Sequence, residues 1–215
     1  VSPFMVFTEG MLAWPPDPEA WSLRWYRNMI GDCSAEVVSS TVPCSTKWMK
    51  GTVNSFYIGI IATFIATVLG TMAALGLSRP HMPYKALIMS ILISPMIVPL
   101  IITAAGMFFF YARINLVYTF TGVILAHVAL ATPFVVITVT ATLVGFDMNM
   151  VKAAQSLGAK PMRTFFKVIM PLILPGIISG ALFAFITSFD EVVIVMFMAS
   201  IDQLTIPKQM WAGIR

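Results

Sequence analysis

Few side chains of this 215-residue chain could do chemistry in an apolar environment. Asp190 and Glu191 are the only acids within or at the end of a long apolar segment, and His127 stands alone in another. A carboxylate at the centre of a membrane helix costs about 2.5 to 3.5 kcal/mol, so it needs a partner or water. The pair could attract a cation along a path through a membrane. Alternatively, the chain leaves the apolar phase near Ser188, and the pair is solvated or holds subunits together.

A lone histidine inside a membrane can relay protons or bind a ligand. No second histidine, cysteine or acid lies near His127, which favours a satisfied interior histidine. The chain also has no phosphate-binding G-x-x-x-x-G-K-[ST] loop, no H-E-x-x-H motif and no cysteine–histidine cluster. We therefore expect no catalytic, cofactor-binding or metal site, and an integral membrane enzyme is disfavoured.

The two cysteines, Cys33 and Cys44, lie in a polar and aromatic stretch that we interpret as an outer loop over residues 8–51. A disulfide between them is plausible if this loop faces an oxidising compartment. The alternative is a pair of free thiols, because the sequence fixes neither the Cα separation nor the compartment. Both interpretations stay open.

The composition indicates that these residues belong to an all-α integral membrane protein. Hydrophobic residues make up 59% of the chain and charged residues 10%, and the mean hydropathy is +0.90, so there are too few charges to solvate a globular surface. Several apolar runs reach the length of about 20 residues that a spanning helix needs. We expect one transmembrane domain over residues 1–215, with spans at 52–77, 86–111, 116–142 and 172–198. Pro95 and Pro99 should kink the second span.

The chain ends suggest a piece of a longer protein. Residues 1–7 are apolar and are interpreted as the outer end of a first span, and we expect a further span after Arg215. The short loops predict the orientation. The turn at 78–85 holds two Lys/Arg residues and the segment at 145–171 holds four, whereas the loop at 112–115, on the other side, holds one. The positive-inside rule therefore places 145–171 in the cytoplasm.

This cytoplasmic segment predicts two short helices. Asp147 can cap a helix that runs through Leu157, and Gly158 then suits a left-handed position that is favourable for glycine. Pro161 suits the first turn of the second helix. The second helix is amphipathic, with its apolar side chains at Met162, Phe165, Phe166 and Ile169. The first helix has a small, smooth side that could dock into another protein.

The same segment resembles the cytoplasmic coupling loop of binding-protein-dependent ABC importer permeases, whose signature reads E-A-A-x-x-x-G-x(9)-I-x-L-P. Ala153, Ala154, Gly158 and Pro171 match at the required spacing, and Val168 and Met170 stand where the pattern has Ile and Leu. Lys152 replaces the acidic first residue. That replacement puts in doubt any salt bridge that the family forms there. The resemblance implies that contact with an ATPase involves Lys152, Ala153, Ala154, Leu157, Gly158 and Pro171.

Nearly the whole chain is similar to the spermidine/putrescine branch of these permeases. The similarity rests on the stretches WSLRWY at 21–26, NS at 54–55, TPFVV at 132–136, SFDE at 188–191 and LTIP at 204–207. It implies a multi-span bundle of the type I importer kind, with six spans in the full protein, so the first would be mostly missing here and the last entirely absent. It also implies that Asp190 and Glu191 line the path of a small cationic solute such as a polyamine.

The resemblance further implies a set of partners in a bacterial inner membrane. These are a dimer of ATP-binding subunits, which would hold ATP and Mg, a second permease that is identical or different, a periplasmic substrate-binding protein and the lipid bilayer; nucleic acid is not expected. One alternative is an ABC permease for another small solute. Another is a transporter driven by an ion gradient, which would show a buried ionisable relay over several spans or paired broken helices. Only His127 and the acidic pair are available for such a relay.

Overall fold

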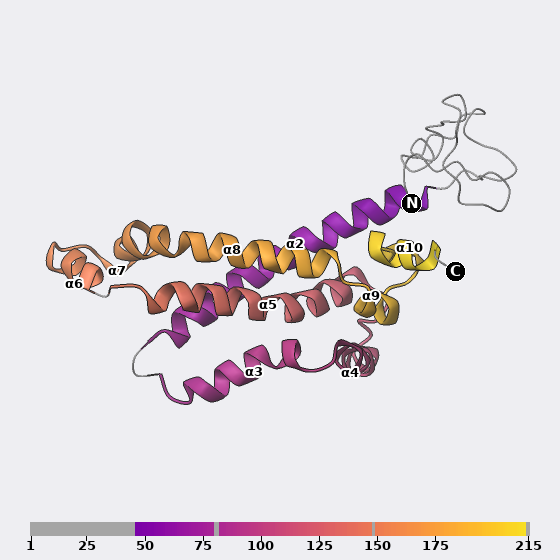
Figure 1. The fold of residues 1–215 in the computed structure, drawn as a ribbon, viewed down its shortest axis with the longest axis horizontal. Coiled ribbons are helices and arrows are strands. Elements are labelled where there is room, and N and C mark those ends of the chain that lie inside the picture. Colours follow the sequence, from indigo (N-terminus) through magenta and orange to yellow (C-terminus); the bar gives the residue numbers. More distant parts are fainter. Residues whose placement is uncertain (1–45, 80–81, 148, 214–215) are drawn as a thin grey trace, which may run out of the picture. The chain divides into compact units, whose positions relative to one another are not determined.

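The computed structural model describes residues 46–79, 82–147 and 149–213, and these residues contain helices and no strand. In chain order (Figure 1) the elements are α2 (Lys47–Leu77), α3 (Lys85–Ile97), α4 (Leu100–Arg113), α5 (Phe120–Val144), α6 (Asn149–Ser156), α7 (Pro161–Thr164), the π-helix η2 (Phe165–Ile169), α8 (Met170–Phe189), α9 (Val193–Met198), the 3-10 helix η3 (Ile201–Gln203) and α10 (Ile206–Gly213). The expected outer loop, the end of a first span and the possible Cys33–Cys44 disulfide lie outside the described residues.

Two compact parts make up the chain. One contains residues 55–203, and the other contains the described residues 46–54 together with 204–213. Within the second part, the Asn54 side-chain amide donates to the Leu204 carbonyl over 3.0 Å. A Cβ added at Gly51 would lie 3.5 Å from the backbone of Thr205 and Ile206, which is ordinary van der Waals contact. The candidate site lies in the part over residues 55–203.

Three helices in the described residues are long and apolar enough to cross a membrane. They are Lys47–Leu77, Phe120–Val144 and the continuous helix Pro161–Phe189, which is formed by α7, η2 and α8. The pair α3 and α4 meets at a bend of 103° and adds a fourth span if the two helices count as one. The prediction of an all-α membrane protein is confirmed.

The interval expected to hold one kinked span, 86–111, contains the separate helices α3 and α4. Val98 ends α3 in an extended conformation, with φ −70° and ψ 136°, and Pro99 directly precedes α4. A proline ring disfavours the helical conformation of the residue before it, which accounts for the break at Val98. Pro95, by contrast, lies inside α3.

The end of the coupling segment also differs from the expectation. The sequence suggested a loop through Pro171 and a span from 172, whereas one helix runs from Pro161 to Phe189. A proline inside an α-helix clashes with the carbonyl four residues before it. A wide π turn at Phe165–Ile169, closed by the Met170 N–H donating to the Phe165 carbonyl, lies directly before Pro171. The proline is therefore accommodated inside the helix.

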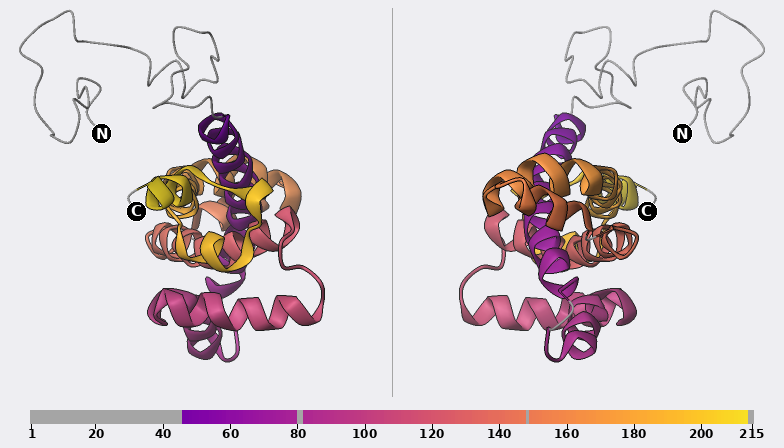
Figure 2. Two further views of the ribbon diagram at one scale, coloured as in Figure 1. Left: turned by 90° about the vertical axis from the view of Figure 1, so that its right-hand side faces the viewer. Right: turned by 90° about the vertical axis from the view of Figure 1, so that its left-hand side faces the viewer.

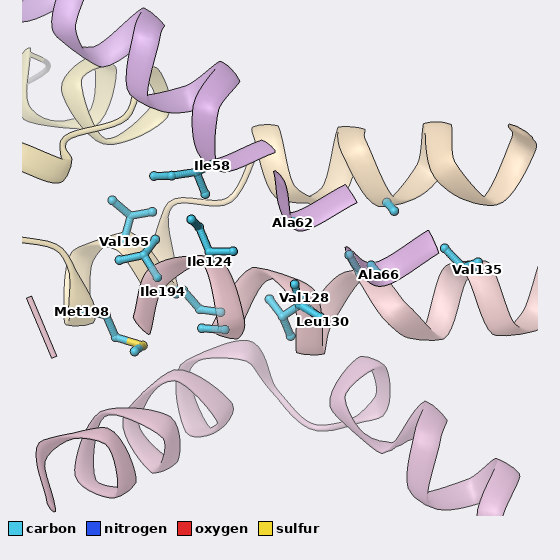
Figure 3. Close-up of a cluster of buried hydrophobic side chains, with 14 of the residues drawn as sticks. Ile58, Ala62, Ala66, Ile124, Val128, Leu130, Val135, Ile194, Val195 and Met198 are labelled. Carbon is cyan, nitrogen blue, oxygen red and sulfur yellow. The ribbon is translucent and has the colours of Figure 1, made fainter. Parts of the chain in front are cut away.

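α5 is the central helix of the part over residues 55–203. It lies beside α8, and α2 crosses the pair obliquely (Figure 2). A Cβ added at Gly70 of α2 would lie 2.7 Å from the Val135 Cβ, and one added at Gly180 of α8 would lie 3.0 Å from the Val135 Cα. Glycine lets helices approach closely where lipid removes the hydrophobic driving force between them. The buried hydrophobic cluster contains side chains from α2, α5 and α9 (Figure 3), together with Ala104 of α4 and Ile173 and Ala184 of α8.

Candidate functional site

The first candidate region is the segment between α5 and the long helix. Asp147 accepts the Asn149 N–H at its Oδ1 over 2.9 Å, and its carbonyl accepts the Met150 N–H over 3.1 Å. A short acidic side chain just before a helix satisfies backbone donors that have no partner within the helix. Asp147 therefore starts α6, in line with the prediction.

A Schellman motif ends α6. The Gly158 N–H donates to the Gln155 carbonyl over 2.9 Å, and the Ala159 N–H donates to the Ala154 carbonyl over 3.0 Å. Gly158 has φ +78°, the left-handed conformation predicted for it. Pro161 begins α7, where its missing N–H costs nothing, again as predicted.

The surface of this segment combines apolar side chains with cations. α6 has no buried residue, and the Leu157 side chain is 88% exposed. The Met150, Met162 and Phe166 side chains are exposed nearby in the chain. The cations Lys152, Lys160, Arg163 and Lys167 are all exposed as well. Exposed apolar side chains with polar neighbours are typical of surfaces that bind another protein or a membrane.

The six expected coupling residues do not all lie on this surface. Five of them, from Lys152 to Gly158, belong to α6 and the turn that ends it. Pro171 is the second residue of α8, inside the long helix and beyond the π turn. The spacing of the signature groups Pro171 with the other five residues. In the structure, the long helix separates Pro171 from the turn at Gly158.

The second candidate region is the opposite end of the α5–α8 pair, where α8 ends and α9 begins (Figure 1). His127 is buried in α5, and its Nδ1 lies 2.8 Å from the Ser188 Oγ of α8. The His127 Nε2 is buried with no hydrogen-bond partner in the described residues. The preferred interpretation of a hydrogen-bonded interior histidine is confirmed at one ring nitrogen. No group of three or more metal-ligating side chains occurs in the part of the chain that the structure describes.

Helix α8 ends earlier than the sequence suggested. If the helix continued, Glu191 would share a face with Gly176, Gly180 and Ala184. Instead, α8 ends at Phe189, and Ser188 completes this buried face. Glu191 accepts the Ile194 N–H at its Oε1 over 2.9 Å and thereby caps α9. The span expected at 172–198 therefore breaks after Phe189, because the Glu191 carboxylate satisfies a backbone donor at the start of a new helix.

The two acids occupy different environments. Glu191 is only 7% exposed, whereas Asp190 is exposed. Burial raises the pKa of Glu191, while the N–H groups of Ile194 and Val193 lower it and nearby Asp190 raises it further. Glu191 therefore has a structural role in capping α9, and Asp190 carries the carboxylate that a solute could reach.

A polar link that the sequence did not indicate holds the segment after α9 to the loop before α5. The Tyr118 N–H donates to the Met198 carbonyl over 2.9 Å, and the Gln203 Nε2 donates to the Tyr118 carbonyl over 3.1 Å. The Gln203 Oε1 also accepts the Ser200 N–H over 2.8 Å. Tyr118 has φ +63°, an uncommon conformation for a residue of this size. No pattern of residue types in the sequence identifies this contact.

Comparisons with known proteins agree with this architecture. Two similar relatives are the spermidine/putrescine transport system permease protein PotC of Haemophilus influenzae and the trehalose transport system permease protein SugB of Mycobacterium tuberculosis. PotC is 29% identical over 167 residues, which are 78% of this chain and 65% of PotC. SugB is 33% identical over 144 residues, which are 67% of this chain and 53% of SugB. The chain thus spans less than two thirds of the length of each of these relatives.

A solved structure shares the fold. It is a bacterial ABC transporter involved in the import of the acidic polysaccharide alginate, and it matches with a TM-score of 0.63 at 14% sequence identity. The match covers 89% of this chain and 72% of that chain. Residues 66–213 match the family described as binding-protein-dependent transport system inner membrane component. This range includes both ends of the α5–α8 pair, and the chain therefore belongs to this family, the permeases of ABC importers, with relatives in its polyamine branch.

Proposed function

We propose that this chain is one permease subunit of an ATP-driven importer in a bacterial cytoplasmic membrane, and that its substrate is a small cationic amine such as putrescine or spermidine. Family membership assigns transport, not catalysis, to the chain. Hydrolysis of ATP, with its Mg, then belongs to a separate dimer of ATP-binding subunits. A second permease, identical or different, and a periplasmic substrate-binding protein complete the importer.

One observation carries the coupling part of the proposal, namely the exposed helix α6, which ends in a hydrogen-bonded turn at Gly158. The turn at Gly158 leads through Pro161 into the helix that continues as α8. At its other end, α6 follows α5 after a short connection that contains Asp147. A partner that binds α6 and moves it would therefore move α5 and α8 together. Docking of the ATPase on α6 fits this geometry.

Asp190 supports the choice of a cationic substrate. Its carboxylate is exposed at the end of α8, while the neighbouring acid is occupied by the backbone of α9. An acid at this position can meet an ammonium group by a charge-assisted hydrogen bond. The name of the PotC relative adds the polyamine class.

A neutral sugar is the second candidate substrate, because SugB shows a similar level of identity. Uptake by the complete importer in proteoliposomes distinguishes the two candidates. We expect uptake of labelled putrescine or spermidine that requires internal ATP and no proton gradient, and no uptake of trehalose. Trehalose uptake without polyamine uptake would reject the proposed substrate. Polyamine uptake on a proton gradient without ATP would reject the coupling to an ATPase.

A further inference from the structure

Asp190 lies in a turn whose two flanks are both held by buried contacts. Two residues before it, the Ser188 Oγ lies 2.8 Å from the His127 Nδ1. One residue after it, the Glu191 Oε1 accepts the Ile194 N–H over 2.9 Å. We propose that His127 is a positioning residue for transport, because its bond to Ser188 fixes the end of α8 and thereby the place of the Asp190 carboxylate. This inference rests on the proposed function, in which Asp190 meets a cationic substrate.

The surroundings of His127 show what its ring contributes. The side chain is 1% exposed, and its neighbours along α5, Ala126 and Val128, belong to the hydrophobic core. The Nε2 is buried without a partner in the described residues, which costs free energy that an apolar side chain in this core would avoid. The hydrogen bond between the His127 Nδ1 and the Ser188 Oγ is what an apolar side chain could not provide.

The other flank of the turn is attached to the same end of α5. Tyr118 directly precedes Thr119, the N-cap residue of α5, and its N–H donates to the Met198 carbonyl at the end of α9. The Gln203 side chain adds a bond to the Tyr118 carbonyl. The start of α5 thus holds α9 through the Tyr118 backbone and holds α8 through His127. Without the His127 bond, only the α8 side of the turn would be released.

A spin label at position 190 tests this directly. The label is attached to Asp190→Cys in the complete importer, after Cys33→Ser and Cys44→Ser. Ser188→Ala and His127→Leu each remove the bond, and His127→Asn keeps an amide near the place of Nδ1. The matched control is Ser90→Ala, which removes an exposed hydroxyl that bonds only within α3, to the Ala86 carbonyl. We expect the label mobility to rise by at least about twofold in the first two variants, and to stay unchanged in His127→Asn and Ser90→Ala.

Putrescine uptake with Asp190 intact gives the second measurement. We expect Ser188→Ala to raise KM by about threefold to tenfold with kcat within about twofold, and His127→Asn to stay near the parent value. An immobile label in both bond-deleting variants would overturn the inference, and so would a mobile label with unchanged KM. If His127→Leu does not assemble, Ser188→Ala alone decides. If the parent importer takes up neither putrescine nor spermidine, the proposed substrate is wrong, while the label still decides whether His127 positions the turn.

Discussion

The two ends of the α5–α8 pair are held together by different kinds of contact. Toward α6, glycines of α8 lie directly against threonines of α5. A Cβ added at Gly180 would collide with the Thr138 Oγ1, and one added at Gly176 would collide with Thr142. These hydroxyls bond within their own helix, Thr138 to the Phe134 carbonyl and Thr142 to the Thr138 carbonyl. The contact between α5 and α8 there depends on how closely their surfaces fit, and not on hydrogen bonds between these threonines and α8.

At the Asp190 end, the elements are joined by hydrogen bonds, which have a defined geometry. His127 and Ser188 join the two helices, and Glu191 caps the next one. Close packing of small residues holds helices together without specifying one hydrogen-bond geometry, whereas a hydrogen bond weakens steeply with distance and angle. The difference suits the proposed function, in which the subunit would receive movement at α6 and keep Asp190 in place for the substrate.

The largest expected effect is at the α6 end, where Gly158→Val should abolish the coupling of ATP hydrolysis to transport. Gly158 has φ +78°, and a left-handed conformation costs about 1–2 kcal/mol for a residue with a Cβ. The Schellman turn would open, and α6 would no longer present one fixed surface. The measurement is the ratio of putrescine transported to ATP hydrolysed in proteoliposomes.

Gly145→Val is the matched control for this prediction. Gly145 also lies between α5 and α6, but its φ is −80° and the nearest atom to an added Cβ is the Thr142 carbonyl oxygen at 3.8 Å. We expect it to retain coupling. If Gly158→Val retained the parent ratio, the docking role of α6 would be wrong, and the two ends of the α5–α8 pair would not differ in function as proposed.

The next effect tests the close packing of α8 against α5. Gly180→Ala should destabilise the protein by about 1–3 kcal/mol, because the added methyl group meets the Val135 Cα at 3.0 Å as well as Thr138. Gly106→Ala of α4 is the control, since nothing lies within 4 Å of its added Cβ. That change should stabilise by about 0.5–1 kcal/mol. Thermal unfolding in detergent gives both values, and equal shifts for the two variants would show that the helices are not in close contact.

A smaller effect separates the two acids. Glu191→Ala removes the acceptor for the Ile194 N–H and should cost about 1 kcal/mol of stability, while raising the KM for putrescine less than Asp190→Ala does. Asp190→Ala, the same change on the exposed neighbour, should change stability by less than about 0.5 kcal/mol and raise KM. Thermal unfolding and uptake kinetics measure the two quantities. The opposite pattern would exchange the roles assigned to the acids.

The sequence predicted the features that depend on neighbouring residues. The left-handed glycine at 158, the start of α6 at Asp147 and the first turn at Pro161 all follow from local backbone preferences. The break in the second apolar interval follows in the same way from Pro99, although its angle of 103° exceeds a kink. Such preferences act within a few residues, so they can be predicted from the sequence without knowledge of the fold.

The sequence could not show the features that depend on distant residues or on competing local effects. Ser188 meets His127 across 61 positions, and Gln203 meets Tyr118 across 85. Pro171 suggested a helix boundary, but a π turn before it lets the helix continue. The span expected at 172–198 did not foresee the end of α8 at Phe189, because nothing in the immediate neighbours of Glu191 indicates that it caps a new helix. Each of these required the packed arrangement of α5, α8 and α9.

The smallest expected effect concerns Lys152, where the importer signature has an acid. The side chain is exposed on α6, so a change of charge there alters neither the packing of α5 against α8 nor the turn at Gly158. We expect Lys152→Glu to leave the coupling ratio unchanged or to improve it, because the signature acid would then face the ATPase. Parallel measurement with Lys167→Glu, an exposed cation of η2 at a position where the signature specifies no residue type, separates Lys152 from a general loss of positive charge. A loss of coupling in Lys152→Glu alone would mean that this importer uses a cation where its family pattern has an acid, and that the ATPase surface opposite α6 is adapted to it.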